Sequence, residues 1–178
     1  GGLVGYSIQI AVDNAFVTGQ VKGSNVYAGG LIGLNDAAST ISNTYADVDV
    51  HGDYYSGGLL GYNGSTGTVL NSYAAGKVTA TTPYAGGLIA LNNGGTVTNS
   101  YWNIESSGQV FSSGGTGRTT AQMLSLSTYS GWNIDAQAGT GTTWRIYDGL
   151  AAPLLRSFLT PLTVTAGETK TYDGTNYT

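Results

Sequence analysis

The sequence predicts an all-β fold, a parallel β-solenoid of about four coils of 28 residues each. Three observations predict it: a motif that recurs at a fixed period, strand-forming segments bounded by Gly and Asn, and a composition unsuited to helices. The 178 residues include 29 Gly and no Cys, and 9% are charged. Each Gly in the interior of a helix destabilises that helix by about 1 kcal/mol relative to Ala. The lack of Cys excludes a disulfide-stapled scaffold, and the net charge of -4 argues against a nucleic-acid partner.

A Gly-Gly-Leu motif sets the period of the repeat. It begins at Gly1, Gly29, Gly57 and Gly86, so successive copies lie 28, 28 and 29 residues apart. A second motif, Asn followed two residues later by an aromatic residue, keeps nearly the same spacing in all four copies. A period in this range is typical of solenoids, propellers and arrays, and a four-stranded propeller blade needs about 40–45 residues. Each copy is therefore expected to form one coil of two or three short strands.

Equivalent residues of neighbouring coils are expected to stack in ladders about 4.8 Å apart. Leucines would fill the narrow core, aromatic rings would form a buried stack, and each Asn side chain would bond to the next coil. The paired glycines are expected to serve tight turns and positions with positive φ. The predicted ladders are Leu3, Leu31, Leu59 and Leu88; Phe16, Tyr45, Tyr73 and Tyr101; and Asn14, Asn43, Asn71 and Asn99.

The periodicity stops near residue 110, which divides the chain into three parts. Residues 1–110 form the predicted solenoid. Residues 111–160 contain Trp132, Trp144 and a final apolar run, and we assign them as a C-terminal cap over the open end of the solenoid. The stretch beginning at Thr119 is the one segment expected to start a helix, with Thr119 as its N-cap. Residues 161–178 are expected to be a linker and the first strand of another module.

The Gly-Gly-Leu-x-Gly and Asn-x-Tyr pair resembles the GLUG motif over residues 1 to about 108. Phe16 departs from it in the first copy and Ala90 in the fourth. The segment after the repeats, and the Lys-Thr-Tyr-Asp-Gly-Thr stretch at 170–175, resemble the region C-terminal to GLUG repeats in filamentous-haemagglutinin-like exoproteins, including their Tyr-Asp-Gly modules. The resemblance, with the general preference for right-handed crossovers, implies a right-handed β-helix.

The same resemblance implies a function. It points to a non-catalytic structural or adhesive segment of a large filamentous adhesin, outside the cell or on the surface of a Gram-negative bacterium. It also implies two-partner secretion through an outer-membrane partner, with a host-cell or surface glycan or protein as possible receptor. No run approaches 18 apolar residues, so we expect no membrane-spanning segment.

A second hypothesis is a carbohydrate- or receptor-binding module that uses tyrosine-rich side faces. Exposed aromatic rings can stack on sugars, although the same residues could instead form a buried ladder. The best candidates for a ligand surface are Tyr27, Tyr54, Tyr55 and Tyr84.

The stretch from 47 to 53 is the sharpest cluster of polar residues. Alternation along a strand places Asp47, Asp49, His51 and Asp53 on one face. These groups could bind a divalent cation. The competing interpretation is a solvated outer face, because the acidic cluster is absent from the other copies. On that interpretation Asp49 pairs with Lys77 of the next coil.

A third hypothesis is a polysaccharide-processing enzyme. Asp47 and Asp49 would lie about 6.6–7 Å apart along a strand, which is admissible for glycoside chemistry. His51 is the only His and lies near no Gly-x-Ser-x-Gly elbow. The Gly-rich motif lacks the Lys-Ser/Thr and the helix of a phosphate loop. We therefore expect neither enzymatic activity nor a cofactor.

Overall fold

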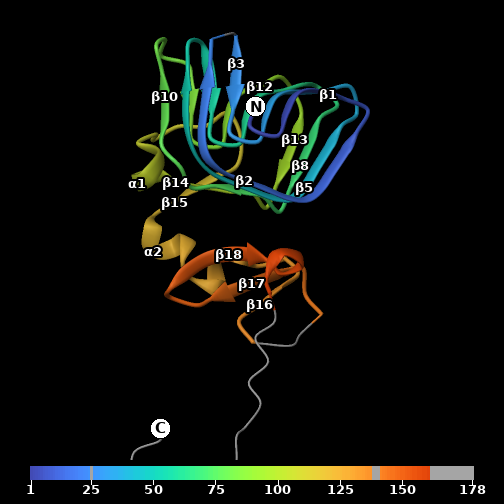
Figure 1. The fold of residues 1–178 in the computed structure, drawn as a ribbon, viewed down its shortest axis with the longest axis vertical. Coiled ribbons are helices and arrows are strands. Elements are labelled where there is room, and N and C mark those ends of the chain that lie inside the picture. Colours follow the sequence, from blue (N-terminus) through green and yellow to red (C-terminus); the bar gives the residue numbers. More distant parts are fainter. Residues whose placement is uncertain (25, 138–140, 161–178) are drawn as a thin grey trace, which may run out of the picture.

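The computed structural model describes residues 1–24, 26–137 and 141–160. In these residues the chain forms a parallel β-solenoid of four coils, followed by a smaller C-terminal segment (Figure 1). This confirms the predicted fold class.

Short strands connected by tight bends make up each coil. The first coil contains β1 (Val4–Ile8) and β2 (Ala11–Gly23), and the second contains β3 (Tyr27–Gly29), β4 (Ile32–Asp36) and β5 (Thr40–Gly52). The third contains β6 (Tyr55–Gly57), β7 (Leu60–Asn63), β8 (Thr68–Leu70), β9 (Tyr73–Ala74) and β10 (Val78–Ala80). The fourth contains β11 (Ala85–Gly86), β12 (Ile89–Asn92), β13 (Thr96–Thr98) and β14 (Tyr101–Asn103).

The coils pair in register along three parallel sheets. One sheet has the order β1-β4-β7-β12 and a second has the order β11-β6-β3. The third is built around β5, which pairs with β2 on one side and with β8, β9 and β10 on the other. The partners follow the sequence period: Ile41 lies between Val12 and Val69.

The interior of the solenoid is a stack of aliphatic side chains. Leu31, Leu59 and Leu88 are fully buried, as predicted, whereas Leu3 is 49% exposed because it lies on the outer edge of the first coil. Trp102 occupies the other end of the core, in register with Ala74 of the preceding coil. Its bulky indole ring fills the core at the end where the coils stop.

The paired glycines are required because a larger residue would not fit between neighbouring coils. The prediction that they have positive φ is wrong. None of the eight is among the positive-φ residues. A Cβ on Gly30 would lie 2.1 Å from the carbonyl oxygen of Gly58, and one on Gly58 would lie 2.2 Å from that of Gly87. The glycine pair therefore lets neighbouring backbones approach closely at one corner of every coil.

The asparagines of the Asn-x-aromatic motif bend the backbone once in every coil, and the predicted amide ladder at these positions is also wrong. Their φ values are 45–51°, the left-handed region that Asn tolerates best among non-glycine residues. In the described residues, no hydrogen bond joins any two of them. The four residues are Asn14, Asn43, Asn71 and Asn99.

The amide ladder lies instead inside the solenoid, on other asparagines. Asn35 Nδ2 donates to Asn63 Oδ1 at 2.8 Å, and Asn63 Nδ2 donates to Asn92 Oδ1 at 3.0 Å. Ser7 begins the ladder by donating to Asn35 Oδ1 at 2.7 Å. Asn35 and Asn63 are fully buried, so these bonds satisfy polar groups that water cannot reach.

The chain after the fourth coil first covers the edge of that coil. It begins with α1 (Ile104–Ser107), a helix that the sequence analysis missed although Asn103 caps it. The backbone N–H of Gly87 then donates to the carbonyl of Phe111. β15 (Thr116–Arg118) pairs with β14 and extends the sheet by one strand.

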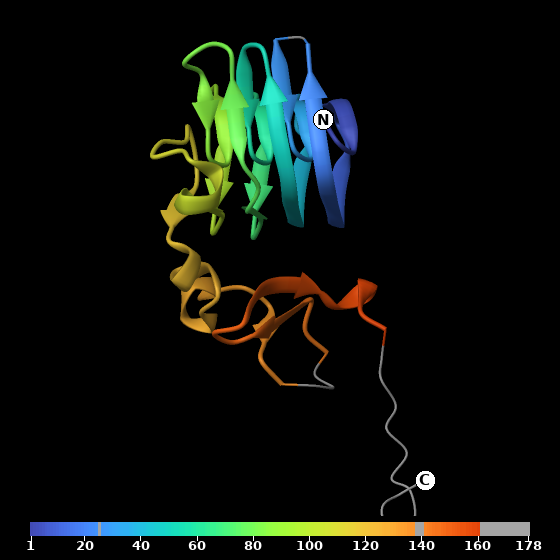
Figure 2. The same cartoon turned by 60° about the vertical axis from the view of Figure 1, so that its left-hand side comes forward.

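The remaining C-terminal residues run back along the side of the coils (Figure 2). Thr119 caps α2 through a capping box, which confirms the predicted helix start. A small sheet comes next, with β16 parallel and β18 antiparallel to β17. The elements are α2 (Thr120–Met123), η1 (Leu126–Tyr129), β16 (Ile134–Asp135), β17 (Trp144–Tyr147), β18 (Ala151–Leu155) and η2 (Arg156–Phe158).

Substitution of Gly61 tests the close approach of the coils. A Cβ there would lie 2.7 Å from the Gly33 carbonyl oxygen and 2.9 Å from the Ala28 nitrogen. We expect Gly61→Ala to lower the free energy of unfolding in urea by about 1–3 kcal/mol. Gly5→Ala is the matched control because no atom lies within 4 Å of its Cβ. Equal effects of the two substitutions would contradict the packing argument.

Substitution of Asn63 tests the buried amide ladder. Asn63→Ala leaves the buried Asn35 Nδ2 without its acceptor and the half-buried Asn92 Oδ1 without its donor, and an unpaired buried group costs about 1–3 kcal/mol. Urea unfolding is therefore expected to show a loss of about 1–3 kcal/mol. The exposed Asn93→Ala should stay within about 0.5 kcal/mol of the parent chain. A small loss in Asn63→Ala would show that the ladder contributes little.

Candidate functional site

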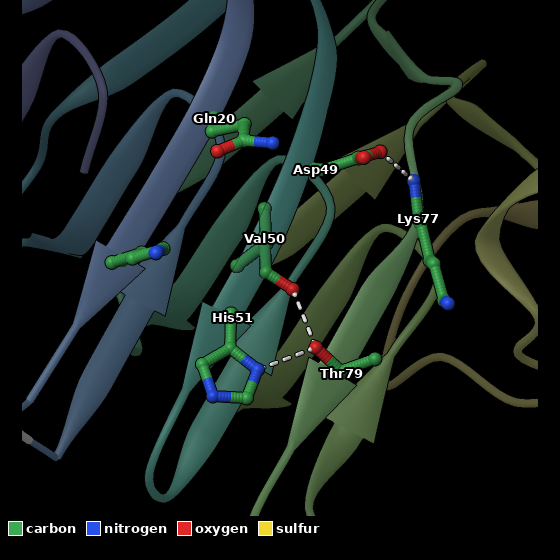
Figure 3. Close-up of a pocket in the computed structure, with 7 residues that line it drawn as sticks. Gln20, Asp49, Val50, His51, Lys77 and Thr79 are labelled. Carbon is green, nitrogen blue, oxygen red and sulfur yellow. Dashed lines mark hydrogen bonds between the residues drawn. The ribbon is translucent and has the colours of Figure 1, made fainter.

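Strand β5 presents a polar outer face, as the alternation predicts. Asp47, Asp49 and His51 are exposed, while Val48 and Val50 are 1% exposed and point into the core. Figure 3 shows the centre of this face across three coils. It is a shallow hollow of about 370 Å³ lined by side chains of both charges. Because the charges are mixed, this face has no strong preference for an anion or a cation.

Hydrogen bonds on this face run from coil to coil. Thr79 Oγ1 donates to the Val50 carbonyl at 3.1 Å and lies 2.9 Å from His51 Nδ1 (Figure 3). A threonine hydroxyl has a single proton to donate. When that proton goes to the Val50 carbonyl, the hydroxyl accepts from His51 and the proton of the imidazole ring lies on Nδ1.

The predicted ion pair between the Asp49 and Lys77 side chains does not form, although the two residues are hydrogen-bonded. The Asp49 carboxylate accepts from the backbone N–H of Lys77 at 3.1 Å. The Lys77 side chain points away from the carboxylate (Figure 3). The contact thus joins two coils through the backbone and leaves the ammonium in solvent.

The structure does not assemble the predicted metal cluster. Asp53 lies beyond the end of β5, in the turn before β6. Within 1–24, 26–137 and 141–160, no three His, Asp or Glu side chains lie close enough together to hold one metal ion. Asp47, Asp49 and His51 share a face but no common centre.

A second exposed surface, here called the tyrosine face, lies along the sheet of β3, β6 and β11. The Tyr27 and Tyr55 rings stack at 5.5 Å between centroids, and the Tyr55 and Tyr84 rings at 5.0 Å. Tyr54 stacks on Tyr84 at 5.8 Å, and these two side chains are 48% and 47% exposed. The four tyrosines proposed as a ligand surface therefore form one continuous group.

Sequence reasoning missed part of the tyrosine face. The Tyr62 ring lies 5.1 Å from that of Tyr27 and extends the group onto the neighbouring sheet. Tyr62 stacks in register with Leu34 and Leu91, and Leu34 with Tyr6. The signal was present, because each of these residues directly follows the Gly-Gly-Leu-x-Gly motif or its variant.

The tyrosine face is suited to binding a partner through ring edges and hydroxyls. Within the stack, neighbouring rings cover the faces of Tyr55, so few ring faces remain for a flat ligand. Burial within the stack raises the pKa of Tyr27 above its ordinary value, and the nearby Tyr62 and Tyr55 raise it further. The Tyr27 hydroxyl is therefore protonated, and able to donate, at neutral pH. Rigid aromatic side chains offer contact area at a small cost in conformational entropy.

The predicted aromatic ladder forms for Phe16, Tyr45 and Tyr73, on the outside of the coils beneath the C-terminal segment. The fourth predicted member departs from it, because the Tyr101 ring packs against Tyr129 and Trp132 instead. The Tyr45 ring is parallel to those of Phe16 and Tyr73, with centroids 5.0 and 5.1 Å apart. Trp144 packs 6.1 Å from both tyrosines. Burial raises the pKa of Tyr73 well above its ordinary value, and its hydroxyl donates to the Pro153 carbonyl at 2.8 Å. This ladder is a packing surface and is closed to ligands.

Asp13 forms a polar junction between the first two coils that the sequence analysis did not identify. Its carboxylate accepts from Ser42 Oγ at 2.6 Å and from Asn43 Nδ2 at 2.9 Å. A third bond comes from Asn14 Nδ2 at 2.5 Å. Partial burial raises the pKa of Asp13, but the three side-chain hydrogen bonds and a fourth from the Asn14 backbone outweigh it, and the net shift of the pKa is downward.

Comparison with protein-family models gives a match to the two central coils. The family model described as the GLUG motif matches residues 24–50 and 52–79, which are the second and third coils. No curated protein and no solved structure matches the chain. None of the helices in the described residues has the length and apolar character needed to cross a bilayer.

The pH dependence of stability tests the Asp13 junction. Because folding lowers the pKa of Asp13, its contribution is complete above the ordinary carboxyl value of about 4 and is lost as pH falls below it. We expect Asp13→Asn to be less stable than the parent at pH 7 and to lose less stability between about pH 5 and 2. Urea unfolding across this range measures both. Asp53→Asn removes one exposed charge as the control; identical profiles for the two variants would contradict the assignment.

Proposed function

We propose that this chain is a non-catalytic structural and adhesive segment of a large bacterial protein exposed outside the cell. The observation that carries the proposal is the unbroken stack of in-register coils, in which each coil bonds to its neighbours along three sheets. Such a stack gains stability from each coil interface. It resists bending and serves as a rod that holds contact surfaces away from the cell.

The C-terminal segment supports a load-bearing role because it contacts all four coils. The Phe158 ring lies 4.9 Å from that of Phe16 in the first coil, and Trp144 packs on Tyr45 and Tyr73 of the second and third. Trp132 Nε1 donates to the Asn99 carbonyl of the fourth coil at 2.8 Å. We call this arrangement the side brace. It opposes the separation of any one coil from the next.

The cellular context rests on the sequence resemblance. The GLUG match and the segment C-terminal to the repeats favour a filamentous-haemagglutinin-like adhesin. Such a protein would be exported from a Gram-negative bacterium by two-partner secretion, with an outer-membrane partner. The stretch that resembles a Tyr-Asp-Gly module, at 170–175, lies outside the described residues.

A second candidate function is a carbohydrate- or receptor-binding module, favoured by the tyrosine face. Tyr54 and Tyr84 are about half exposed and stack on each other at the edge of that face. Tyrosines in such positions often contribute most of the binding energy of an interface. The two functions are compatible, since a rod that displays a binding face is an adhesin.

Adhesion of coated beads to epithelial cell layers tests the proposal. Beads carrying the full chain are expected to adhere, and Tyr54→Ser combined with Tyr84→Ser should reduce adhesion roughly tenfold because it removes the exposed rings. Tyr147→Ser is the matched control: its side chain is 45% exposed but lies on β17. Equal adhesion of parent and double variant would contradict a role for the tyrosine face.

The same preparation tests the enzymatic alternative. Incubation with bacterial and host polysaccharides should release no reducing sugar, because the chain is proposed to be non-catalytic. Release that disappears in Asp47→Asn or Asp49→Asn would overturn the proposal and restore the polysaccharide-processing hypothesis.

A further inference from the structure

A polar hollow lies where the C-terminal segment leaves the last coil. It measures about 670 Å³ and opens between β14, β15, α2 and η1. Pockets at the junction of two packed units are a common location for ligand sites. The lining residues that matter here are Tyr101, Arg118, Gln122, Ser125, Thr128 and Ser130.

Among the residues that line this hollow, Arg118 is the one charged group. The guanidinium carbon lies 5.4 Å from the centre of the Tyr101 ring, which holds the side chain in place. Its Nε is buried and has no hydrogen-bond partner. No carboxylate forms an ion pair with Arg118 in the part of the chain that the structure describes. Because Nε is buried, a ligand in the hollow would meet the guanidinium through its two terminal nitrogens, which are the pair that binds a carboxylate side-on.

The rest of the lining supplies hydroxyls and amides. Ser125 Oγ lies 2.9 Å from Ser127 Oγ at the rim, and Thr128 Oγ1 donates to the Gln122 carbonyl. The lining contains neither a carboxylate nor a second cation. A ligand that fits this chemistry has one negative charge and several hydroxyl groups.

We propose that this hollow binds a carboxylated sugar residue of an acidic glycan. A guanidinium matches the two oxygens of a carboxylate in a bidentate pair, and the serines, threonine and glutamine are suited to the ring hydroxyls. A polyanion such as nucleic acid needs several cations, whereas here there is one. The inference goes beyond the proposed structural role and uses other residues than the tyrosine face.

Binding to the full chain is followed by NMR of the arginine Nε–H signals. The probes are glucuronic acid and N-acetylneuraminic acid, with glucose as the neutral control and sodium sulfate as the simple anion. We expect the Arg118 signal to shift with the two acidic sugars, to be unaffected by glucose, and to respond more weakly to sulfate. Absence of a shift with either acidic sugar overturns the proposal. An equal response to sulfate also overturns it, because the site would then select charge alone.

Variants assign the binding to the hollow. Arg118→Gln should weaken binding of the acidic sugars at least tenfold, and Arg118→Lys, which keeps the charge but loses the planar fork, should fall between this variant and the parent. Arg145→Gln is the matched control, because Arg145 also has a buried unpartnered nitrogen and stacks on a tyrosine outside the hollow. Equal losses in Arg118→Gln and Arg145→Gln would contradict the assignment.

Two further measurements separate the possible failures. Circular dichroism melts check that each variant folds, and the parent NMR titration stands without any variant. The Tyr54→Ser and Tyr84→Ser double variant should bind the acidic sugars as the parent does. Loss of sugar binding in that variant would contradict a separate site at Arg118. Failure of bead adhesion alone would leave the site intact.

Discussion

Each coil of this solenoid finds the partners for its backbone hydrogen bonds in the coils on either side, and the rest of the structure depends on keeping that register. A shift of one residue would turn the valines of β5 outward and its aspartates inward. The period of 28 residues is therefore maintained at the corners by two kinds of residue. Glycine pairs allow close approach of the backbone, and asparagines with φ of 45–51° bend the chain at a second point of each coil. The inward side chains then fall into ladders as a consequence.

This solenoid has two ends and a side face on each of its three sheets, and the C-terminal segment covers one end and one side face. At the C-terminal end, Trp102 fills the core and β15 covers the last strand. Along the side, the brace covers an aromatic ladder that would otherwise be a long apolar stripe open to solvent. The polar outer face of β5 and the tyrosine face remain exposed, and the first coil leaves Leu3 and Ile8 about half exposed. The hollow at Arg118 exists because the brace leaves the solenoid there.

Most of the fold could be predicted from the repeat, because residues that stack in one ladder recur at the same interval in the sequence. The leucine core, the aromatic stack and the tyrosine row followed from spacing alone. The amide ladder was assigned to the wrong asparagines, although Asn35, Asn63 and Asn92 recur with the same period. Both sets repeat, and only backbone conformation distinguishes a corner from an inward position. The side brace could not be predicted, since Trp144 meets Tyr45 across about a hundred residues with no periodic signal. The hollow at Arg118 could not be predicted for the same reason.

The most direct test of the stacked register is a nuclear Overhauser experiment on the isotopically labelled chain. Contacts between strands are predicted to recur at sequence separations of 28 or 29 residues, for example between Ile41 and Val69 and between Val69 and Val97. Contacts that join neighbouring strands of one copy as antiparallel hairpins, at separations of about ten residues, would contradict the solenoid and everything derived from it.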